Sequence, residues 1–336
     1  MAGVSRGTVD RVLFNRGRVS AATAERVRQA VDALGYTPNR SASCLAKKKT
    51  TRITCLIPSY MPGDYWQLIE KGFVQAEEEM SEYNLALKIL HYDINDGESF
   101  SSQAATILAD RPDGVITNAA PKEALEHLTQ GLKEAGIPLA FIDNKYDDID
   151  YMMYYGVDPY KSGELGAFLL TMRQDVRSVA LVRIQDGDAC LHDHNSPRRY
   201  GILDYLAAHF PSSPVYTIFV NPEAGDAREK LEAFFSGHPD CRHLICQNSR
   251  VYMLTDYLAG NPDPQRVVIG YDDLEANLRA LQDGHVEFLV TRKVPEQSRL
   301  LLHDFAGCVM GRTAPLRKNN YVHMDILHRN NLDNYI

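Results

Sequence analysis

The chain has 336 residues, of which 44% are hydrophobic and 24% charged, proportions that are ordinary for a globular protein. This length can bury a sizeable core and suits two or three folded units. No apolar run is long enough to span a bilayer, and the first residues lack the apolar stretch of a signal peptide. The six cysteines are scattered without a paired CxxC spacing, which is typical of reduced thiols. These features predict a cytoplasmic protein and exclude a membrane protein.

The net charge of −8 is divided unevenly along the chain. Residues 1–52 carry eleven Lys and Arg against three acidic residues, a balance of +8, so residues 53–336 carry a balance of −16. A basic segment on an acidic body is typical of a protein that contacts nucleic-acid phosphates with one part only. A solvated basic tail would carry the same charge, but it would lack the regular apolar pattern of this segment.

The basic segment predicts two helices. Ser5 is placed to cap the first, and Val9, Val12 and Leu13 recur at the spacing of one buried stripe. The second is predicted from its cap at Ser20 to its end at Gly35, after which Tyr36-Thr37-Pro38 stops helical propagation. In a helix-turn-helix, side chains near the start of the recognition helix reach base edges in the major groove. The predicted contacts from the first helix are Ser5, Arg6, Gly7, Thr8 and Arg11.

Residues 39–51 predict a hinge. The segment Asn39–Ala46 allows a helix of about eight residues, which is marginal alone in water and should fold only against a partner. The lysines that follow it suit a phosphate backbone. The predicted contacts of this hinge with DNA are Asn39, Ala42, Leu45 and Lys48.

Residues 1–46 contain a Val-Ser opening, Thr-Val-x-Arg-Val-Leu, a second Val-Ser and Gly-Tyr-x-Pro-Asn. With these motifs the segment resembles, almost residue for residue, the DNA-binding headpiece of the lactose/purine repressor family. The resemblance implies that Arg6, Gly7 and Arg11 belong to the recognition helix and that Leu45 wedges into a minor-groove step. A buried contact between head and body is the alternative for Leu45. The family's first helix precedes this region, so we expect either a start upstream of Met1 or weak DNA binding by this form.

From residue 53 the pattern changes to alternating strands and helices, which predicts an α/β fold with parallel sheets flanked by helices. The pattern runs twice, which indicates two lobes around a cleft. The order resembles the periplasmic-binding-protein-like (type I) core of the same repressor family over roughly residues 52–312. We therefore expect a helix-turn-helix head in 1–38, a hinge in 39–51, and a two-lobed ligand-binding and dimerisation domain in 52–336.

Ligands of such sheets bind beyond the carboxyl ends of the strands. Several polar or aromatic side chains follow predicted strands, and they suit the hydroxyl groups of a sugar. Arg198 also matches the family's inducer-binding arginine. For some of these residues a structural role is the alternative, core packing for Trp66 and a turn for Asp143 and Asn144. The predicted ligand contacts are Tyr65, Trp66, Asp143, Asn144, Arg198, Asn248, Asp272 and Arg292.

Arg292 and Lys293 stand where relatives usually carry a Gln near the crossover between the lobes. Two interpretations remain open for this pair. The positive charge suits an acidic or phosphorylated ligand, or the two residues form a surface pair that faces acidic neighbours.

One loop contains residue types that bind metals, namely Asp186, Asp188, Cys190, His192, Asp193 and His194. Without a paired motif, such loop residues are usually solvated, so we expect no metal and no cofactor. No phosphate loop or nucleophile motif is present, and we expect no catalytic activity.

These patterns favour a ligand-responsive transcriptional regulator of the repressor type. It should sense a sugar or sugar-derived molecule and bind double-stranded operator DNA as a homodimer. A solute-binding protein without DNA-binding activity is the alternative, but it needs an export signal and does not explain the basic head. An enzyme acting on sugars would need a catalytic pair that we cannot place.

Overall fold

The computed structural model describes residues 2–13, 19–33, 50–172, 175–184, 196–222, 225–315 and 317–335. The chain separates into two compact units, Met1–Lys49 and Thr50–Ile336, called here the head and the body. The residues predicted to form the hinge as far as Lys49, including Asn39, Ala42, Leu45 and Lys48, lie outside the described residues. No described helix is long and apolar enough to cross a membrane.

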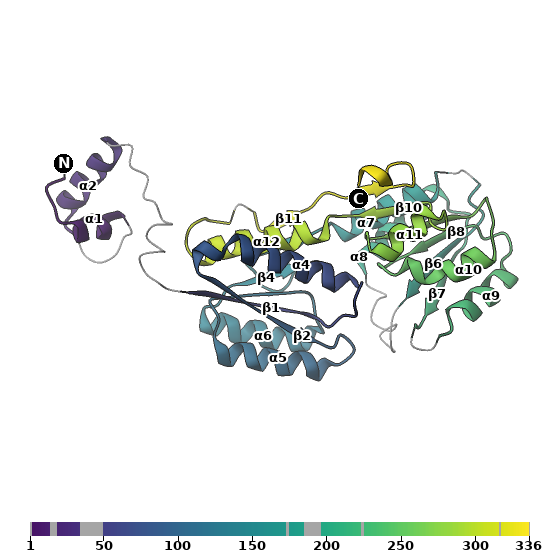
Figure 1. Cartoon of the computed structure of the whole chain (residues 1–336), viewed down its shortest axis with the longest axis horizontal. Helices are drawn as coiled ribbons and strands as arrows, with labels where there is room; N and C mark the ends of the chain where they lie inside the picture. Colours follow the sequence, from purple (N-terminus) through teal and green to yellow (C-terminus); the bar gives the residue numbers. More distant parts are fainter. Residues whose placement is uncertain are drawn as a thin grey trace. The chain divides into compact units, whose positions relative to one another are not determined.

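The head contains the two predicted helices, α1 (Arg6–Leu13) and α2 (Ala21–Ala33) (Figure 1). Each begins after a serine whose Oγ accepts a hydrogen bond from a backbone N–H of the first turn. Ser5 accepts from Thr8 N at 3.2 Å, and Ser20 accepts from Thr23 N at 3.3 Å. Both predicted caps are therefore confirmed.

The body contains two six-stranded sheets with the same order of corresponding strands, β11-β5-β4-β3-β1-β2 and β12-β10-β9-β8-β6-β7. The strands of the first sheet are β1 (Thr51–Pro58), β2 (Leu85–Tyr92), β3 (Gly114–Thr117), β4 (Leu139–Ile142), β5 (Met153–Gly156) and β11 (Asn319–Tyr321). Those of the second are β6 (Val179–Ile184), β7 (Val215–Val220), β8 (His243–Cys246), β9 (Val267–Tyr271), β10 (Phe288–Thr291) and β12 (Asp325–Leu327). The paired strands are parallel except β12, which runs antiparallel to β10.

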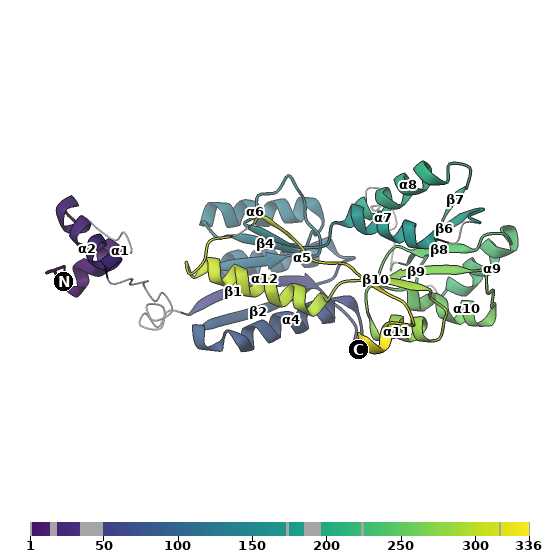
Figure 2. The same ribbon diagram turned by 90° about the horizontal axis from the view of Figure 1, so that it is seen from above.

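Helices cover both faces of each sheet, as Figure 2 shows from above. In the first lobe, one face carries α4 (Tyr65–Glu79) and α12 (Val294–Val309), and the other carries α5 (Gly97–Asp110) and α6 (Lys122–Ala135). In the second lobe, one face carries α7 (Pro159–Leu170) and α8 (Pro197–His209). The other face carries α9 (Ala227–Gly237), α10 (Thr255–Gly260) and α11 (Glu275–Gln282). Short 3-10 turns lie at Ser81–Tyr83, Val251–Leu254 and Leu332–Asn334.

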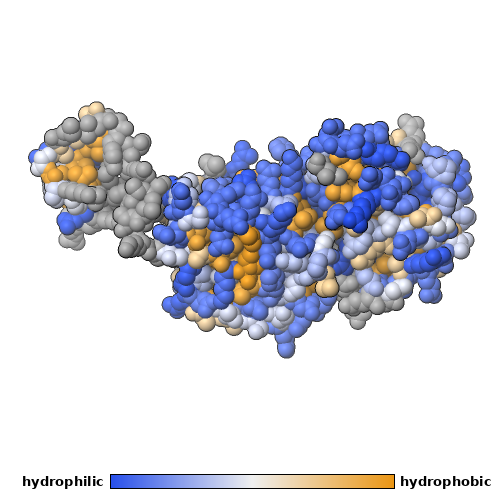
Figure 3. Space-filling view, viewed as in Figure 1, coloured by the Kyte–Doolittle hydropathy of each residue, from blue (hydrophilic) through white to orange (hydrophobic). Residues whose placement is uncertain are grey.

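This double covering explains why the central strands are continuous apolar runs. All residues of β3, β4 and β8 are buried, as expected of parallel strands that have helices on both faces. The surface is mostly hydrophilic in the view of Figure 3, with a hydrophobic patch on the first lobe. Exposed apolar side chains of this lobe include Met61, Val74 and Ile94.

The chain passes from one lobe to the other after β5, after β10 and after β11. As a result α12, which is late in the sequence, packs in the first lobe against α4. The predicted α/β fold with two lobes is confirmed. The apolar run of residues 137–142 forms a strand only from Leu139 onward, because Ile137 N bonds to Leu132 O at the end of α6.

Candidate ligand-binding site

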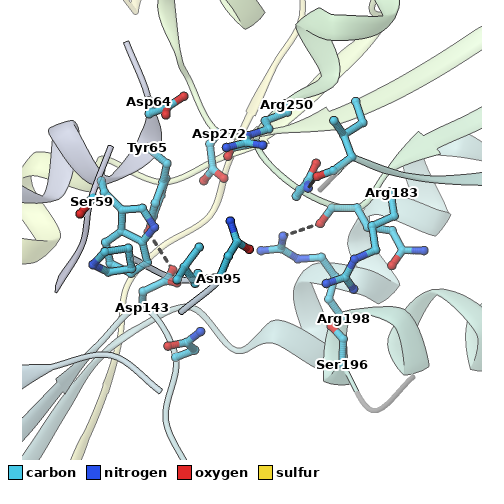
Figure 4. Close-up of a pocket in the computed structure, with 18 of the residues that line it drawn as sticks. Ser59, Asp64, Tyr65, Asn95, Asp143, Arg183, Ser196, Arg198, Arg250 and Asp272 are labelled. Carbon is cyan, nitrogen blue, oxygen red and sulfur yellow. Dashed lines mark hydrogen bonds between the residues drawn. The ribbon is translucent and has the colours of Figure 1, made fainter. Parts of the chain in front are cut away.

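A cavity of about 380 Å³ lies between the carboxyl ends of the strands of the two lobes (Figure 4). Side chains from both sheets line it because parallel strands of one sheet all end at the same edge. All eight predicted ligand contacts line this one cavity: Tyr65, Trp66, Asp143, Asn144, Arg198, Asn248, Asp272 and Arg292. We expected polar residues that follow strands to meet in the cleft, and these eight do. Their role in binding a ligand stays a prediction.

Arg292 is at the centre of a buried network that joins the lobes. Its Nη2 lies 2.5 Å from Asp143 Oδ1 and donates to the Tyr65 hydroxyl at 2.6 Å, while its Nε lies 3.7 Å from Asp272 Oδ1. The Tyr65 hydroxyl in turn donates to Asp143 Oδ1 at 2.7 Å. The Arg292 side chain is only 6% exposed. A buried guanidinium is stable when carboxylates compensate its charge, and two do so here.

The network shifts the pKa values of its members in directions that follow from burial and charge. Burial opposes the charge of Arg292, but Tyr65 and the two carboxylates outweigh it and raise its pKa above the ordinary value. Burial raises the pKa of Asp272, against the pull of Arg292 and Arg198. Burial also raises the pKa of Tyr65 well above its ordinary value. Tyr65 is therefore a neutral donor in this network at physiological pH.

The interpretation of Arg292 and Lys293 as a surface pair is wrong for Arg292. Lys293 is exposed, but Arg292 is 5% exposed and bound to its two carboxylates. The crossover directs Arg292 into the cleft and the next side chain, Lys293, outward. Because Asp143 and Asp272 already balance Arg292, its charge alone does not indicate an acidic ligand.

The two carboxylates occupy corresponding positions in the two lobes. Asp143 follows β4 with φ of 69°, and Asp272 follows β9 with φ of 65°. The N–H of Asp143 donates to Tyr155 O at 3.0 Å, and that of Asp272 donates to Val290 O at 3.0 Å. Asp tolerates this left-handed conformation better than most residues. Both carboxylates lie close to the Arg292 guanidinium and reach it from opposite lobes.

Arg198 reaches the cleft from the first turn of α8. A Cβ on Gly163 of α7 would lie 2.1 Å from Arg198 O, and one on Gly201 would lie 2.0 Å from Tyr160 O, so the two helices cross with their backbones in contact. Arg198 Nη1 donates to Gln247 O at 2.8 Å, and its guanidinium carbon lies 4.2 Å from the centre of the Tyr271 ring. Its Nε has no hydrogen-bond partner among the described residues.

The two asparagines are partly engaged by the protein itself. Asn144 Oδ1 accepts from Ala119 N at 2.7 Å, a structural contact with a distant segment that differs from the turn given as its alternative role. Asn248 Nδ2 donates to Ile184 O, and its Oδ1 accepts from Cys246 Sγ at 3.4 Å. Trp66 is partly buried, packs edge-to-face on Tyr65 with ring centroids 5.3 Å apart, and also lines the cavity. Packing and ligand contact are therefore compatible for Trp66.

The sequence reasoning missed several side chains that line the cavity, chiefly Ser59, Asn95, Arg183 and Arg250. Ser59, Asn95 and Arg250 follow strands β1, β2 and β8, so the same strand-end rule would have found them. Arg183 is the only charged residue of the apolar strand β6, which was the available signal.

The residues predicted to contact DNA are only partly described. Ser5, Gly7 and Arg11 are exposed on the head and Thr8 is partly exposed. The Ser5 and Thr8 hydroxyls lie 3.0 Å apart, so Ser5 caps the helix as well. Arg6 is the first residue of α1. The loop of candidate metal ligands from Asp186 to His194 lies outside the described residues, and the described ones contain no group of three or more such side chains placed to hold a metal.

Comparisons with known families divide the chain into the same two parts as the structure, the head and the body. The family described as periplasmic binding protein domain matches residues 54–311, and the lacI family of bacterial regulatory proteins matches residues 1–39. A protein of Bacteroides fragilis described as a candidate LacI transcriptional regulator has 28% identity and a TM-score of 0.80, covering 86% of this chain and 100% of that one. These matches confirm the resemblance seen in the sequence.

Individual relatives match with lower coverage or identity. The maltose regulon regulatory protein MalI of Escherichia coli (strain K12) is 30% identical over 44% of this chain and 42% of its own length. The HTH-type transcriptional regulator IdnR of the same organism is 28% identical over 75% of this chain and 72% of its own length. An ABC transporter solute-binding protein of Burkholderia graminis, in complex with D-arabinose, has a TM-score of 0.73 at 15% identity, covering 84% of this chain and 97% of that one. That last likeness shows the fold alone.

Proposed function

We propose that this chain, which belongs to the periplasmic binding protein domain family and carries a lacI-type head, is a ligand-responsive DNA-binding transcriptional regulator. The observation that carries the proposal is the combination of that head with a cleft in which polar side chains from both lobes converge. The effector is a small carbohydrate-like molecule. The curated relatives cited above are regulators, and no catalytic role is proposed for any residue of the cleft.

The cleft supports a polyol as ligand because its polar groups are numerous and fixed. The network of Arg292, Asp143 and Tyr65 offers both donors and acceptors, and Trp66 offers an aromatic face. Hydroxyl groups buried in a cleft need such partners, since an unpaired one costs free energy. We assign ligand contact to the eight predicted residues on this ground.

In the head, we propose that Arg6 and Arg11 contact base edges in the major groove and that Gly7 allows close approach to the DNA. Ser5 and Thr8 contact the sugar-phosphate backbone of the DNA. The protein acts as a homodimer because two heads are needed for a two-fold related operator. Since its target is chromosomal DNA, we place the protein in the cytoplasm.

We further propose that the ligand controls DNA binding through the two lobes. A ligand that contacts both lobes stabilises one arrangement of them over others. If the heads bind DNA better in one arrangement, ligand and DNA affinities are coupled, and by linkage each changes the other by the same factor.

The test is DNA selection from a random pool with the full chain, followed by affinity measurements at several salt concentrations. Binding should fall steeply with salt, since lysines and arginines displace counterions. Arg6→Ala should relax base preference, whereas Lys48→Ala should weaken all sequences alike. Arg228→Gln, an exposed α9 arginine paired with Glu232, is the control.

A solute-binding protein would bind sugar in the cleft but show no salt-dependent DNA affinity. That result, together with unchanged DNA binding on addition of ligand, would contradict the proposed function. Equal loss of specific and random DNA binding in Arg6→Ala would instead contradict only its assignment to base readout.

A further inference from the structure

A second cavity, of about 660 Å³, adjoins the cavity described above, which is called here the first cavity. The two share five lining residues: Asp143, Asn144, Ser196, Arg198 and Arg292. Figure 4 shows Asp143 and Arg198 on opposite sides of the first cavity. A ligand held by the shared residues therefore has room to extend beyond them into the second cavity.

The second cavity lies beside the crossovers between the lobes. Asp158 follows β5, Arg292 follows β10 and Tyr321 ends β11, so all three crossovers contribute to its lining. When two lobes rotate relative to each other, atoms move least beside the segments that connect them. The second cavity is therefore the part of the cleft that closure of the lobes alters least.

Tyrosines from both lobes line the second cavity, and the protein itself binds the hydroxyl groups of two that are partly exposed. The Tyr146 hydroxyl donates to Ala120 O at 3.1 Å in the first lobe. The Tyr160 hydroxyl donates to Asp204 Oδ2 at 2.9 Å in the second lobe. These bonds hold both rings in place, so what the two tyrosines offer to a ligand is the surface of the ring.

A third tyrosine presents its ring at the crossover. Tyr321 lines the second cavity and is 54% exposed. It packs edge-to-face on the buried Tyr154, with ring centroids 6.0 Å apart. The Tyr154 hydroxyl is held in turn, at 2.9 Å from Asp143 O. An exposed aromatic ring that rests on a fixed partner is a ready surface for another flat ring.

The charged side chains that line only the second cavity also have partners in the protein. Lys145 pairs with Asp147, and Asp158 Oδ1 accepts from Lys161 N at 3.0 Å at the start of α7. Apolar surface is added by Val157, Pro159 and Pro197. Among the described lining residues few groups remain to pair with hydroxyls, and a buried hydroxyl without a partner costs free energy. The second cavity therefore favours a flat, weakly polar unit over a second polyol.

We propose that the effector is a glycoside with an aromatic aglycone. Its sugar ring lies in the first cavity beside Asp143 and Trp66, and its aglycone lies in the second cavity against Tyr146, Tyr160 and Tyr321. Aromatic rings attract one another in offset-stacked and edge-to-face arrangements, and they bury a large apolar area. This inference rests on the proposed function, in which the cleft binds a carbohydrate-like effector.

The only tryptophan of the chain makes the inference measurable, because Trp66 lines the first cavity and its fluorescence reports on the sugar position. The full chain is titrated with the methyl, cyclohexyl and phenyl glycosides of glucose and galactose, in both anomeric forms, and with cellobiose and gentiobiose. We expect a phenyl glycoside to bind about tenfold more tightly than the methyl glycoside of the same sugar and anomer. The cyclohexyl glycoside should lie between them, because its ring is apolar but not flat. The disaccharides should gain little over the methyl glycosides.

Two tyrosine variants test where the aglycone lies. Tyr321→Ala and Tyr160→Ala should each remove most of the preference for the phenyl glycoside and leave the affinity for the methyl glycoside unchanged. The two residues belong to different segments, so one variant serves if the other does not fold. Phe168→Ala is the matched control, since Phe168 is an aromatic residue of α7 that is 49% exposed and lines neither cavity.

Several results would overturn the inference. A phenyl glycoside that binds no more tightly than its methyl counterpart refutes the aromatic aglycone but leaves the proposed function standing. A disaccharide that binds more tightly than every phenyl glycoside does the same, and so does an unchanged phenyl preference in both tyrosine variants. If no compound changes the Trp66 fluorescence, the inference fails. If the compounds also leave DNA binding unchanged, the proposed sugar response fails with it.

Discussion

The two lobes share one topology but contribute differently to the cleft. Their strand orders correspond position by position, and each places an aspartate in the left-handed conformation after its corresponding strand, Asp143 after β4 and Asp272 after β9. The first lobe adds aromatic groups, uncharged polar groups and Asp64, whereas the second adds three arginines. A repeated fold can therefore build the two walls of one site with different chemistry, because the strand-end residues vary while the strand order does not.

The helix crossings repeat as well. In the first lobe, a Cβ on Gly72 of α4 would lie 2.0 Å from Pro295 O of α12. In the second lobe, Gly163 and Gly201 bring α7 and α8 equally close. The second crossing has glycines on both helices, and it holds Arg198 at the cleft.

The largest effect should come from the residue that joins the lobes. Arg292→Met leaves Asp143 and Asp272 without their cation, and we expect a loss of about 3–5 kcal/mol in the free energy of unfolding, the usual cost of breaking a buried ion pair. Urea denaturation measures it. The triple variant with Asp143→Asn and Asp272→Asn should recover much of the loss. A triple variant as unstable as the single one would show that size, not charge, sets the cost.

The helix crossing should give the next effect. Gly201→Ala places a methyl group against Tyr160 O, and overpacking of this kind costs about 1–3 kcal/mol. Because α8 also carries Arg198, ligand affinity should fall too. Gly72→Ala should destabilise similarly and leave Arg198 in place. Gly237→Ala is the control, since a Cβ there meets nothing within 4 Å. Thermal unfolding measures the stability of both variants, and ligand titration measures their affinity. If Gly72→Ala lost as much ligand affinity as Gly201→Ala, the proposed link between the α7–α8 crossing and Arg198 would be wrong.

The free energy of unfolding should depend on pH differently in the wild type and in the Asp272→Asn variant. Burial raises the pKa of Asp272, so the folded protein binds this proton more tightly than the unfolded chain does. Stability from this proton is full below the ordinary carboxyl pKa of 3.8 and is lost as pH rises through the raised value. Each unit of the shift amounts to about 1.4 kcal/mol. Asp272→Asn should therefore gain stability relative to the wild type as pH rises through this window. Parallel pH profiles would contradict the assignment.

The smallest effects should come from helix caps, one in each lobe. Asp96 Oδ1 accepts from Glu98 N at 2.9 Å at the start of α5, and Asp158 Oδ1 accepts from Lys161 N at 3.0 Å at the start of α7. Each change to Ala should cost about 1 kcal/mol. If the lobes unfold together, calorimetry should show a single transition, and the two substitutions should lower its midpoint temperature equally. Two transitions, each sensitive to one cap, would show that they unfold separately.

Local features were predictable because they depend on neighbours in the sequence. Ser5 and Ser20 cap helices of the head as predicted, and the apolar residues 244–246 all lie within the buried strand β8. The eight predicted ligand contacts meet in one cavity because the strand-end rule needs only the strand boundaries. The rule did not find Arg183, because this residue lies inside strand β6 and not after its end.

The sequence by itself determined the alternation of strands and helices, the caps, and the set of polar residues at strand ends. Only the tertiary structure decided which of them meet. It paired Arg292 with Asp143 from the other lobe, and it returned α12 to the first lobe beside α4. It also brought Arg183, Arg198 and Arg250 to one wall. Hydrophobic periodicity is a local property, whereas the partner of a buried charge depends on sheet order and on where the chain crosses between lobes.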